Sequence, residues 1–255
     1  MAFTVSRWPP TTMAYFLPMT GMDLRVADTA HAAAVAAASQ IAHLMRAAVA
    51  ARGVCTLALS GGNTAVTMLQ ALASNVLPWH AVQLFQVDER IAARGEQERN
   101  FTLLETELIS KVAIERDGVH AMPVEGPDLC GAVTDYARAL KAVAGRPPVL
   151  DVVHLGLGVD GHTASLVPGD RVVADSRSDV AVTVRYQGFR RMTLTFPCLA
   201  RARSRVWLIT GPHKADALAR LFQHDPRIPA SRLALAGNTC FVDRSAATRL
   251  PDTLA

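Results

Sequence analysis

Residues 54–64 read V-C-T-L-A-L-S-G-G-N-T. The apolar run 54–60 has the length and the β-branched content of a strand that is covered on both faces. The run stops at Gly61-Gly62, and apolar residues then return at helical spacing from Thr64 to Ser74. A buried strand, a glycine turn and a helix form one βα unit, which is the building block of a parallel sheet.

The same alternation continues on both sides of this unit. A helix is expected over 31–52, because Asp28 or Thr29 can cap its start and Gly53 can end it in the left-handed conformation. Further strands are expected at 81–90, 149–155, 180–184, 192–196, 205–210 and 240–242, and further helices at 100–112, 132–143 and 214–222. This order predicts an α/β fold with three layers, a mostly parallel, doubly wound sheet between helices.

The composition is typical of one folded domain. The chain has 255 residues, of which 50% are hydrophobic and 19% charged, so a disordered or disulfide-stapled chain is excluded. The 26 basic and 22 acidic residues give a net charge of +4 without the dense basic run of a nucleic-acid-binding arm. The four cysteines are far apart among apolar neighbours, so we expect buried free thiols at Cys55, Cys130, Cys198 and Cys240.

We divide the chain into an N-terminal extension, residues 1–25, and a single α/β domain, residues 26–255. The first residues lack an unbroken apolar core and contain Pro9, Pro10 and Pro18, so a secretory signal is not expected. No stretch of about 18 apolar residues lacks a polar break, so we expect no membrane span. These features predict a cytoplasmic protein with no obligate protein partner.

Candidate functional residues follow the strands, because ligands of open parallel sheets bind at the carboxyl ends of the strands. In the turn after the first buried strand, two glycines allow close backbone approach, and the helix that follows adds its positive end. Hydroxyl groups flank the glycines. The turn is therefore a candidate phosphate cradle, with a plain tight turn as the alternative. The cradle consists of Ser60, Gly61, Gly62, Asn63 and Thr64.

The segment G-L-G-V-D-G, residues 156–161, matches the dinucleotide-binding pattern G-x-G-x-x-G after a strand. That interpretation requires a helix to open there, and Pro168-Gly169 leaves room for barely two helical turns. We therefore expect a loop at this position. His162, directly after Gly161, is a candidate general base beside Asp160.

Other polar residues have simpler alternatives. Arg191 and Lys214 can face the same edge of the sheet as the glycine turn and clamp a phosphate, although single basic residues are usually solvated. His154 lies within a strand and is expected to be a hydrogen-bonded interior or edge residue. The chain has no H-E-x-x-H zinc motif and no G-x-S-x-G elbow for a serine nucleophile. We expect neither a metal nor a cofactor.

Five segments together resemble the 6-phosphogluconolactonases of the glucosamine-6-phosphate isomerase/6-phosphogluconolactonase family. The resemblance runs from about residue 25 to the end of the chain. It is carried by L-S-G-G-N-T (59–64), V-D-E-R (87–90), L-G-L-G-V-D-G-H-T-A-S-L-V-P-G (155–169), R-M-T-L-T (191–195) and G-P-H-K-A (211–215). It implies a NagB/RpiA-like, modified Rossmann fold and cofactor-free hydrolysis of 6-phosphoglucono-1,5-lactone in the oxidative pentose phosphate pathway.

The resemblance also implies roles for single residues. His162 would activate water, and Asp160 would orient either His162 or a hydroxyl group of the substrate. Gly161 would be among the residues that bind the substrate. The 60–64 turn would hold the 6-phosphate together with Arg191 and Lys214. The sugar end would be lined by Asp88 and Arg90, and Arg90 would stabilise the oxyanion.

The sequence departs from the family at several positions, which include Ala65, Val167 and Arg99. Arg99 replaces a serine beside Asn100 and affects the expected shape of the sugar pocket. Two alternatives remain. The first is a phosphosugar isomerase or deaminase, which in the family needs a glutamate that residues 164–166 do not provide. The second is a non-catalytic sugar-phosphate sensor, for which the first 25 residues are too short to form a helix-turn-helix.

Overall fold

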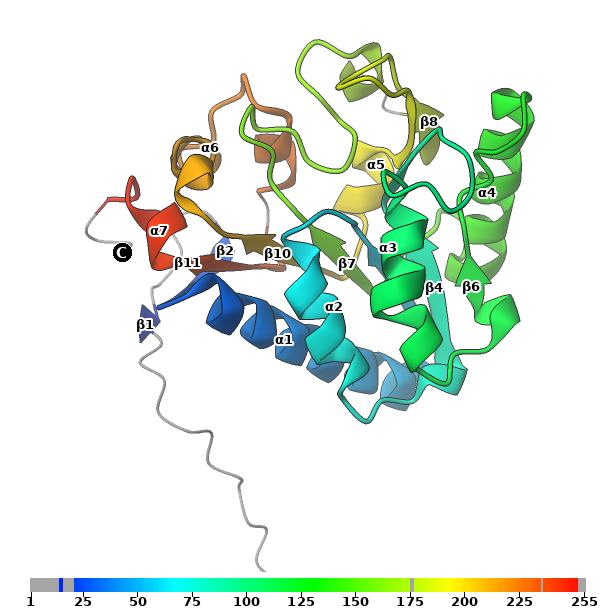
Figure 1. Ribbon diagram of the computed structural model, residues 1–255, viewed down its shortest axis with the longest axis horizontal. Helices are drawn as coiled ribbons and strands as arrows, with labels where there is room; N and C mark the ends of the chain where they lie inside the picture. Colours follow the sequence, from blue (N-terminus) through cyan, green and yellow to red (C-terminus); the bar gives the residue numbers. More distant parts are fainter. Residues whose placement is uncertain (1–13, 16–20, 175–176, 235, 252–255) are drawn as a thin grey trace, which may run out of the picture.

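A parallel sheet forms the centre of the molecule (Figure 1). The computed structural model describes residues 14–15, 21–174, 177–234 and 236–251. All strand pairs in this sheet are parallel except β1 with β2. The order is β1 (Ala14–Tyr15), β2 (Met22–Ala27), β11 (Asn238–Asp243), β10 (Ser204–Ile209), β7 (Val152–Leu155), β3 (Cys55–Leu59), β4 (Val82–Gln86) and β6 (Val119–His120).

Helices cover both faces of this sheet and give the three layers predicted from the sequence (Figure 1). On one face lie α1 (Ala30–Arg52), α2 (Ala65–Ala73) and α3 (Asn100–Glu107). The other face is covered by α4 (Leu129–Ala144), α5 (Phe196–Ala200), α6 (Ala215–Phe222) and α7 (Arg244–Ala247). Short 3₁₀ helices are η1 (Trp79–Ala81), η2 (Ile109–Lys111), η3 (Arg116–Gly118), η4 (Arg171–Ala174), η5 (Pro212–Lys214) and η6 (Pro229–Leu233).

Helix α1 begins and ends as its sequence predicts. Thr29 Oγ1 accepts a hydrogen bond from the Ala32 N–H at 3.1 Å, and Gly53 ends the helix at φ +74°. The helix is long and apolar enough to cross a membrane by length and composition alone. Its buried face consists mainly of alanines, which pack closely against the sheet, so α1 is built into the core of the fold.

A second, antiparallel sheet of three strands was not predicted. It contains β5 (Asp88–Arg90), β9 (Arg191–Leu194) and β8 (Val180–Val182). The prediction of a single strand over 81–90 is wrong, because the chain forms two strands there, β4 and β5, which are separated by Val87. The Val87 N–H donates to Leu59 O at 3.0 Å, and Val87 O accepts from the Leu194 N–H at 2.8 Å. One residue therefore joins the two sheets.

The structure also refines the expectations for the N-terminus and the thiols. Strand β2 begins at Met22, within the range assigned to the extension, whose residues 1–13 and 16–20 lie outside the described part. Cys55, Cys198 and Cys240 are buried, and burial raises the pKa of the first two to about 12. The prediction is wrong for Cys130, which lies near the start of α4 on its exposed side.

Candidate active site

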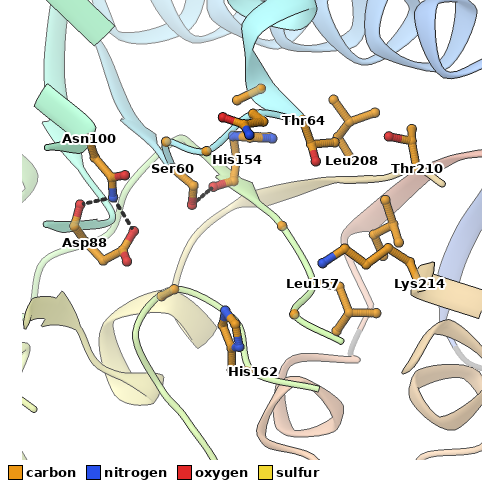
Figure 2. Close-up of a pocket in the computed structure, with 18 of the residues that line it drawn as sticks. Ser60, Thr64, Asp88, Asn100, His154, Leu157, His162, Leu208, Thr210 and Lys214 are labelled. Carbon is orange, nitrogen blue, oxygen red and sulfur yellow. Dashed lines mark hydrogen bonds between the residues drawn. The ribbon is translucent and has the colours of Figure 1, made fainter. Parts of the chain in front are cut away.

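A cavity of about 220 Å³ opens at the carboxyl ends of β3, β7 and β10 (Figure 2). It contains every site residue predicted from the sequence except Asp160 and Gly161, which directly precede His162 in the chain. The lining residues are Ser60, Gly61, Gly62, Asn63, Thr64, Ala65, Asp88, Arg90, Asn100, His154, Gly156, Leu157, Gly158, His162, Ala164, Arg191, Leu208, Ile209, Thr210 and Lys214. Five segments far apart in the sequence therefore meet at one edge of the sheet.

The turn at 60–64 has the backbone shape of an anion cradle. Gly62 has φ +98°, and a Cβ on Gly61 would lie 2.3 Å from Asn100 Oδ1, so both positions require glycine. The N–H groups of Gly62, Asn63 and Thr64 donate to no protein acceptor within the described residues. They lie where α2 begins and where its dipole is positive, so they can receive an anion.

His162 is held by Asp160 in a specific orientation. Asp160 Oδ1 lies 2.6 Å from His162 Nδ1 and also accepts the backbone N–H of His162 at 3.1 Å. Burial acts to raise the pKa of Asp160, but the hydrogen bonds from His162 and Tyr186 outweigh it and keep the pKa below its usual value. In the neutral ring, the contact assigns the proton to Nδ1 and leaves Nε2 as the basic nitrogen.

Glycines allow the loop of His162 to fold this closely. A Cβ on Gly158 would lie 2.0 Å from His162 Nδ1, and Gly161 has φ +86° beside the side chain of Ile228. The Gly158 N–H donates to His162 O at 2.8 Å. No helix follows Gly161, as expected for a loop and in contrast to a dinucleotide-binding turn.

Three cations face the cavity. Arg90 and Arg191 are direct cross-strand partners in β5 and β9, where like charges repel. Burial lowers the pKa of both Arg191 and Lys214. Neither Arg191 nor Lys214 has an ion-pair partner in the part of the chain that the structure describes. Figure 2 shows Lys214 pointing into the cavity. Positive charge that is not tied up in an ion pair favours an anionic ligand.

Asn100 is a site residue that sequence reasoning missed. Its Nδ2 donates to Asp88 O at 2.9 Å and to Asp88 Oδ1 at 3.2 Å, and its Oδ1 accepts from Arg90 Nη1 at 2.8 Å (Figure 2). Ser165 Oγ donates to Asp88 Oδ2 at 2.5 Å. Burial raises the pKa of Asp88 despite this bond. Asn100 thus holds Asp88 and Arg90 in place together. The one signal of this role in the sequence is that Asn100 lies ten residues after the V-D-E-R segment.

Arg99, one of the departures from the family pattern, does not line the cavity. It is buried outside the cavity, where its Nε lies 2.9 Å from Glu89 Oε2 and its Nη1 lies 3.0 Å from Glu125 Oε1. Glu89 in turn accepts the backbone N–H groups of Asn100 and Phe101 at 2.7 and 2.9 Å. The carboxylate therefore caps α3, and Arg99 balances its buried charge.

His154 was predicted to be hydrogen-bonded, and this prediction is wrong. The side chain is buried in β7, and both ring nitrogens lack a partner among the described residues. Burial lowers the pKa of His154 to about 4, and the nearby backbone of Ser60 opposes this with a smaller effect. The backbone O of His154 accepts from Ser60 Oγ at 3.0 Å, which ties the strand to the cradle (Figure 2).

The fold and the cavity define a class of α/β protein whose site combines cations that can bind an anion with an Asp–His pair that can transfer a proton. Within the described residues, no cluster of three or more His, Cys, Asp or Glu is arranged to hold a metal ion. Residues 28–241 match the family model of glucosamine-6-phosphate isomerases/6-phosphogluconolactonase. The chain belongs to this family.

Individual relatives and solved structures agree with this family assignment. The chain is 38% identical to the 6-phosphogluconolactonase of Mycobacterium tuberculosis over 231 residues. This alignment covers 85% of this chain and 93% of the relative. The structure of 6-phosphogluconolactonase from Trypanosoma brucei superposes with a TM-score of 0.80 at 23% identity, covering 92% and 100% of the two chains. The structure of a monomeric glucosamine-6-phosphate deaminase superposes with a TM-score of 0.78 at 17% identity, and the match covers 89% of this chain and 99% of the deaminase. The fold alone therefore does not separate lactonase from deaminase.

Proposed function

We propose that this chain is a 6-phosphogluconolactonase, a carboxylic ester hydrolase of the oxidative pentose phosphate pathway. It converts 6-phospho-D-glucono-1,5-lactone and water into 6-phospho-D-gluconate. The observation that carries the proposal is the Asp160–His162 pair at the edge of a cavity that also holds two cations without ion-pair partners. A phosphorylated ester matches both features, because its phosphate needs positive charge and its hydrolysis needs a base.

His162 acts as the general base. Its Nδ1–H is held by Asp160, so Nε2 takes a proton from a water molecule as the water oxygen attacks the lactone carbonyl. The tetrahedral intermediate collapses by breaking the ring C–O bond. The imidazolium then returns its proton to the departing ring oxygen, which becomes a hydroxyl group of the product. Asp160 stabilises the imidazolium between these steps.

The remaining residues bind the two ends of the substrate. The cradle Ser60, Gly61, Gly62, Asn63 and Thr64 holds the 6-phosphate together with Arg191 and Lys214. Arg90 stabilises the oxyanion that develops on the carbonyl, since Asn100 and the backbone of Glu98 fix its guanidinium. Asp88 lines the sugar end.

Deamination, the alternative chemistry of the family, needs a carboxylate that this chain does not have directly after His162. Residues 163–167, which follow His162, are Thr-Ala-Ser-Leu-Val and contain no carboxylate for opening an amino sugar. Ser165 and Leu166 are buried, and the hydroxyl of Ser165 is bonded to Asp88. The site is therefore equipped for lactone hydrolysis.

The test follows the loss of freshly generated lactone against its spontaneous hydrolysis. The parent protein accelerates the loss, and His162→Ala reduces the rate by about 10²–10⁴-fold while product binding persists. His43→Ala, which removes an exposed imidazole from α1, serves as the control. Ammonia release from glucosamine 6-phosphate would instead show a deaminase. Tight phosphosugar binding without turnover would show a sensor.

We further propose that the enzyme works in the cytoplasm on this small-molecule lactone. We expect the site to work without a nucleic acid, a membrane or an obligate protein partner, since the residues assigned to the mechanism all belong to this chain. The single α/β domain expected over residues 26–255 contains them all. Fractionation of the cells that make the protein tests the location.

A further inference from the structure

Tyr186 lies at the tip of a tight hairpin that the family motifs do not include. The Tyr186 N–H donates to Phe189 O at 2.8 Å, and the Phe189 N–H donates to Tyr186 O at 3.2 Å. Between them, Gln187 and Gly188 have φ +47° and +85°, the pattern of a two-residue type I′ turn. The turn fixes the backbone from which the Tyr186 ring projects.

The side chain of Tyr186 contacts both members of the Asp–His pair. Its hydroxyl donates to Asp160 Oδ2 at 2.9 Å, while the other carboxylate oxygen holds His162. Its ring meets the His162 ring edge to face, with centroids 5.5 Å apart and an interplanar angle of 70°. The guanidinium carbon of Arg191 lies 5.3 Å from the centroid of the Tyr186 ring. Tyr186 thus connects the carboxylate, the imidazole and a cation of the cavity.

We propose that Tyr186 is a positioning residue that fixes the Asp160–His162 pair and sets the affinity of this pair for a proton. The expected effect of Tyr186 on turnover rests on the hydrolysis proposed above. The hydroxyl saturates the carboxylate oxygen that does not face His162. The ring blocks rotation of the imidazole on one side. Arg191, which lines the cavity, packs over the Tyr186 ring and holds the ring against His162.

The proton affinity of His162 depends on every charged group around it. Asp160 belongs to the same loop, Arg191 comes from β9, and Lys214 comes from η5. Asp88 and Arg90 of β5 line the same cavity. Tyr186→Phe alters none of these charges. It removes a hydrogen bond to Asp160, so the carboxylate attracts the imidazolium more strongly and His162 keeps its proton to a higher pH.

The experiment compares Tyr186→Phe with Tyr136→Phe. Tyr136 is the matched control, because its buried hydroxyl bonds only the backbone of Gln86, away from the cavity. In Tyr186→Phe we expect about a threefold higher proton affinity of His162 by NMR titration without substrate, and about a tenfold lower kcat with little change in KM. The acid limb of the pH–rate profile moves to higher pH. Tyr136→Phe leaves titration and profile unchanged.

Tyr186→Ala separates the ring from the hydroxyl, since it should lower kcat further than Tyr186→Phe. The proposal is overturned if Tyr186→Phe titrates like the parent, or if its kcat and pH profile match those of Tyr136→Phe. An inactive parent protein would overturn the proposed function instead. The NMR titration needs no turnover, so it would still decide whether Tyr186 controls the proton on the pair.

Discussion

Replacing His154 with leucine should change how the stability of the protein depends on pH. The imidazole is buried in β7, its ring nitrogens have no hydrogen-bond partner among the residues that the structure describes, and burial lowers its pKa from 6.5 to about 4. Between these two pH values the unfolded chain binds a proton that the folded chain does not. The free energy of unfolding therefore falls as the pH drops through this window, and the loss is complete below the folded pKa.

The size of the effect follows from the two pKa values. One pH unit corresponds to about 1.4 kcal/mol, so the displacement of the His154 pKa from 6.5 to about 4 costs at most about 3.5 kcal/mol at low pH. At neutral pH, leucine replaces two unpartnered nitrogens with apolar atoms in a buried site. The free energy of unfolding should then change by less than about 1 kcal/mol or increase.

Urea unfolding measured from about pH 7.5 to about pH 4.5 tests this reasoning. His154→Leu should flatten the decline in stability on acidification, whereas His43→Leu, at an exposed position in α1, should follow the parent protein. Parallel curves for the parent and His154→Leu would refute the reasoning. They would mean that the imidazole takes up its proton in the folded state, with a partner or water.

Two further predictions concern the cavity. Lys214→Ala should raise KM by about tenfold or more with a smaller effect on kcat, since a cation is lost from the end of the cavity proposed to bind the phosphate. Lys111→Ala should leave KM and kcat unchanged. Equal effects in steady-state kinetics would contradict the assignment. Gly158→Ala should lower kcat by at least about tenfold at near-normal stability, because its Cβ would displace His162; Gly126→Ala, where a Cβ meets open space, is the control. Normal kcat in Gly158→Ala would show that the loop adjusts freely.

The sequence predicts the main sheet well because local signals and tertiary contacts agree there. Thr29 and Gly53 mark both ends of α1, and its alanines suit a helix that packs closely on a sheet. The division of 81–90 is not predictable in the same way. The residues on both sides of Val87 suit a strand, and only the partners Leu59 and Leu194 decide that the chain changes sheets there.

The same distinction applies to the site. The strand-end turns were identifiable because glycines and polar residues there interrupt apolar runs. Asn100 and Tyr186 were missed because they come from a helix start and a hairpin tip, and their partners lie far away in the sequence. The burial of His154 was expected, but the lack of a partner depends on side chains from other elements. The sequence left the effect of Arg99 open, because its counter-charges, including Glu125, are visible only in the fold.

The passage of the chain through Val87 has a consequence for synthesis on the ribosome. Strand β5 is made directly after β4, but its partner β9 follows only after about a hundred further residues. Over that interval β5 is an open edge to which other nascent chains could pair. Its sequence is Asp-Glu-Arg, and consecutive charges oppose such pairing. The charges of β5 therefore oppose pairing of this edge with other nascent chains until β9 has been made.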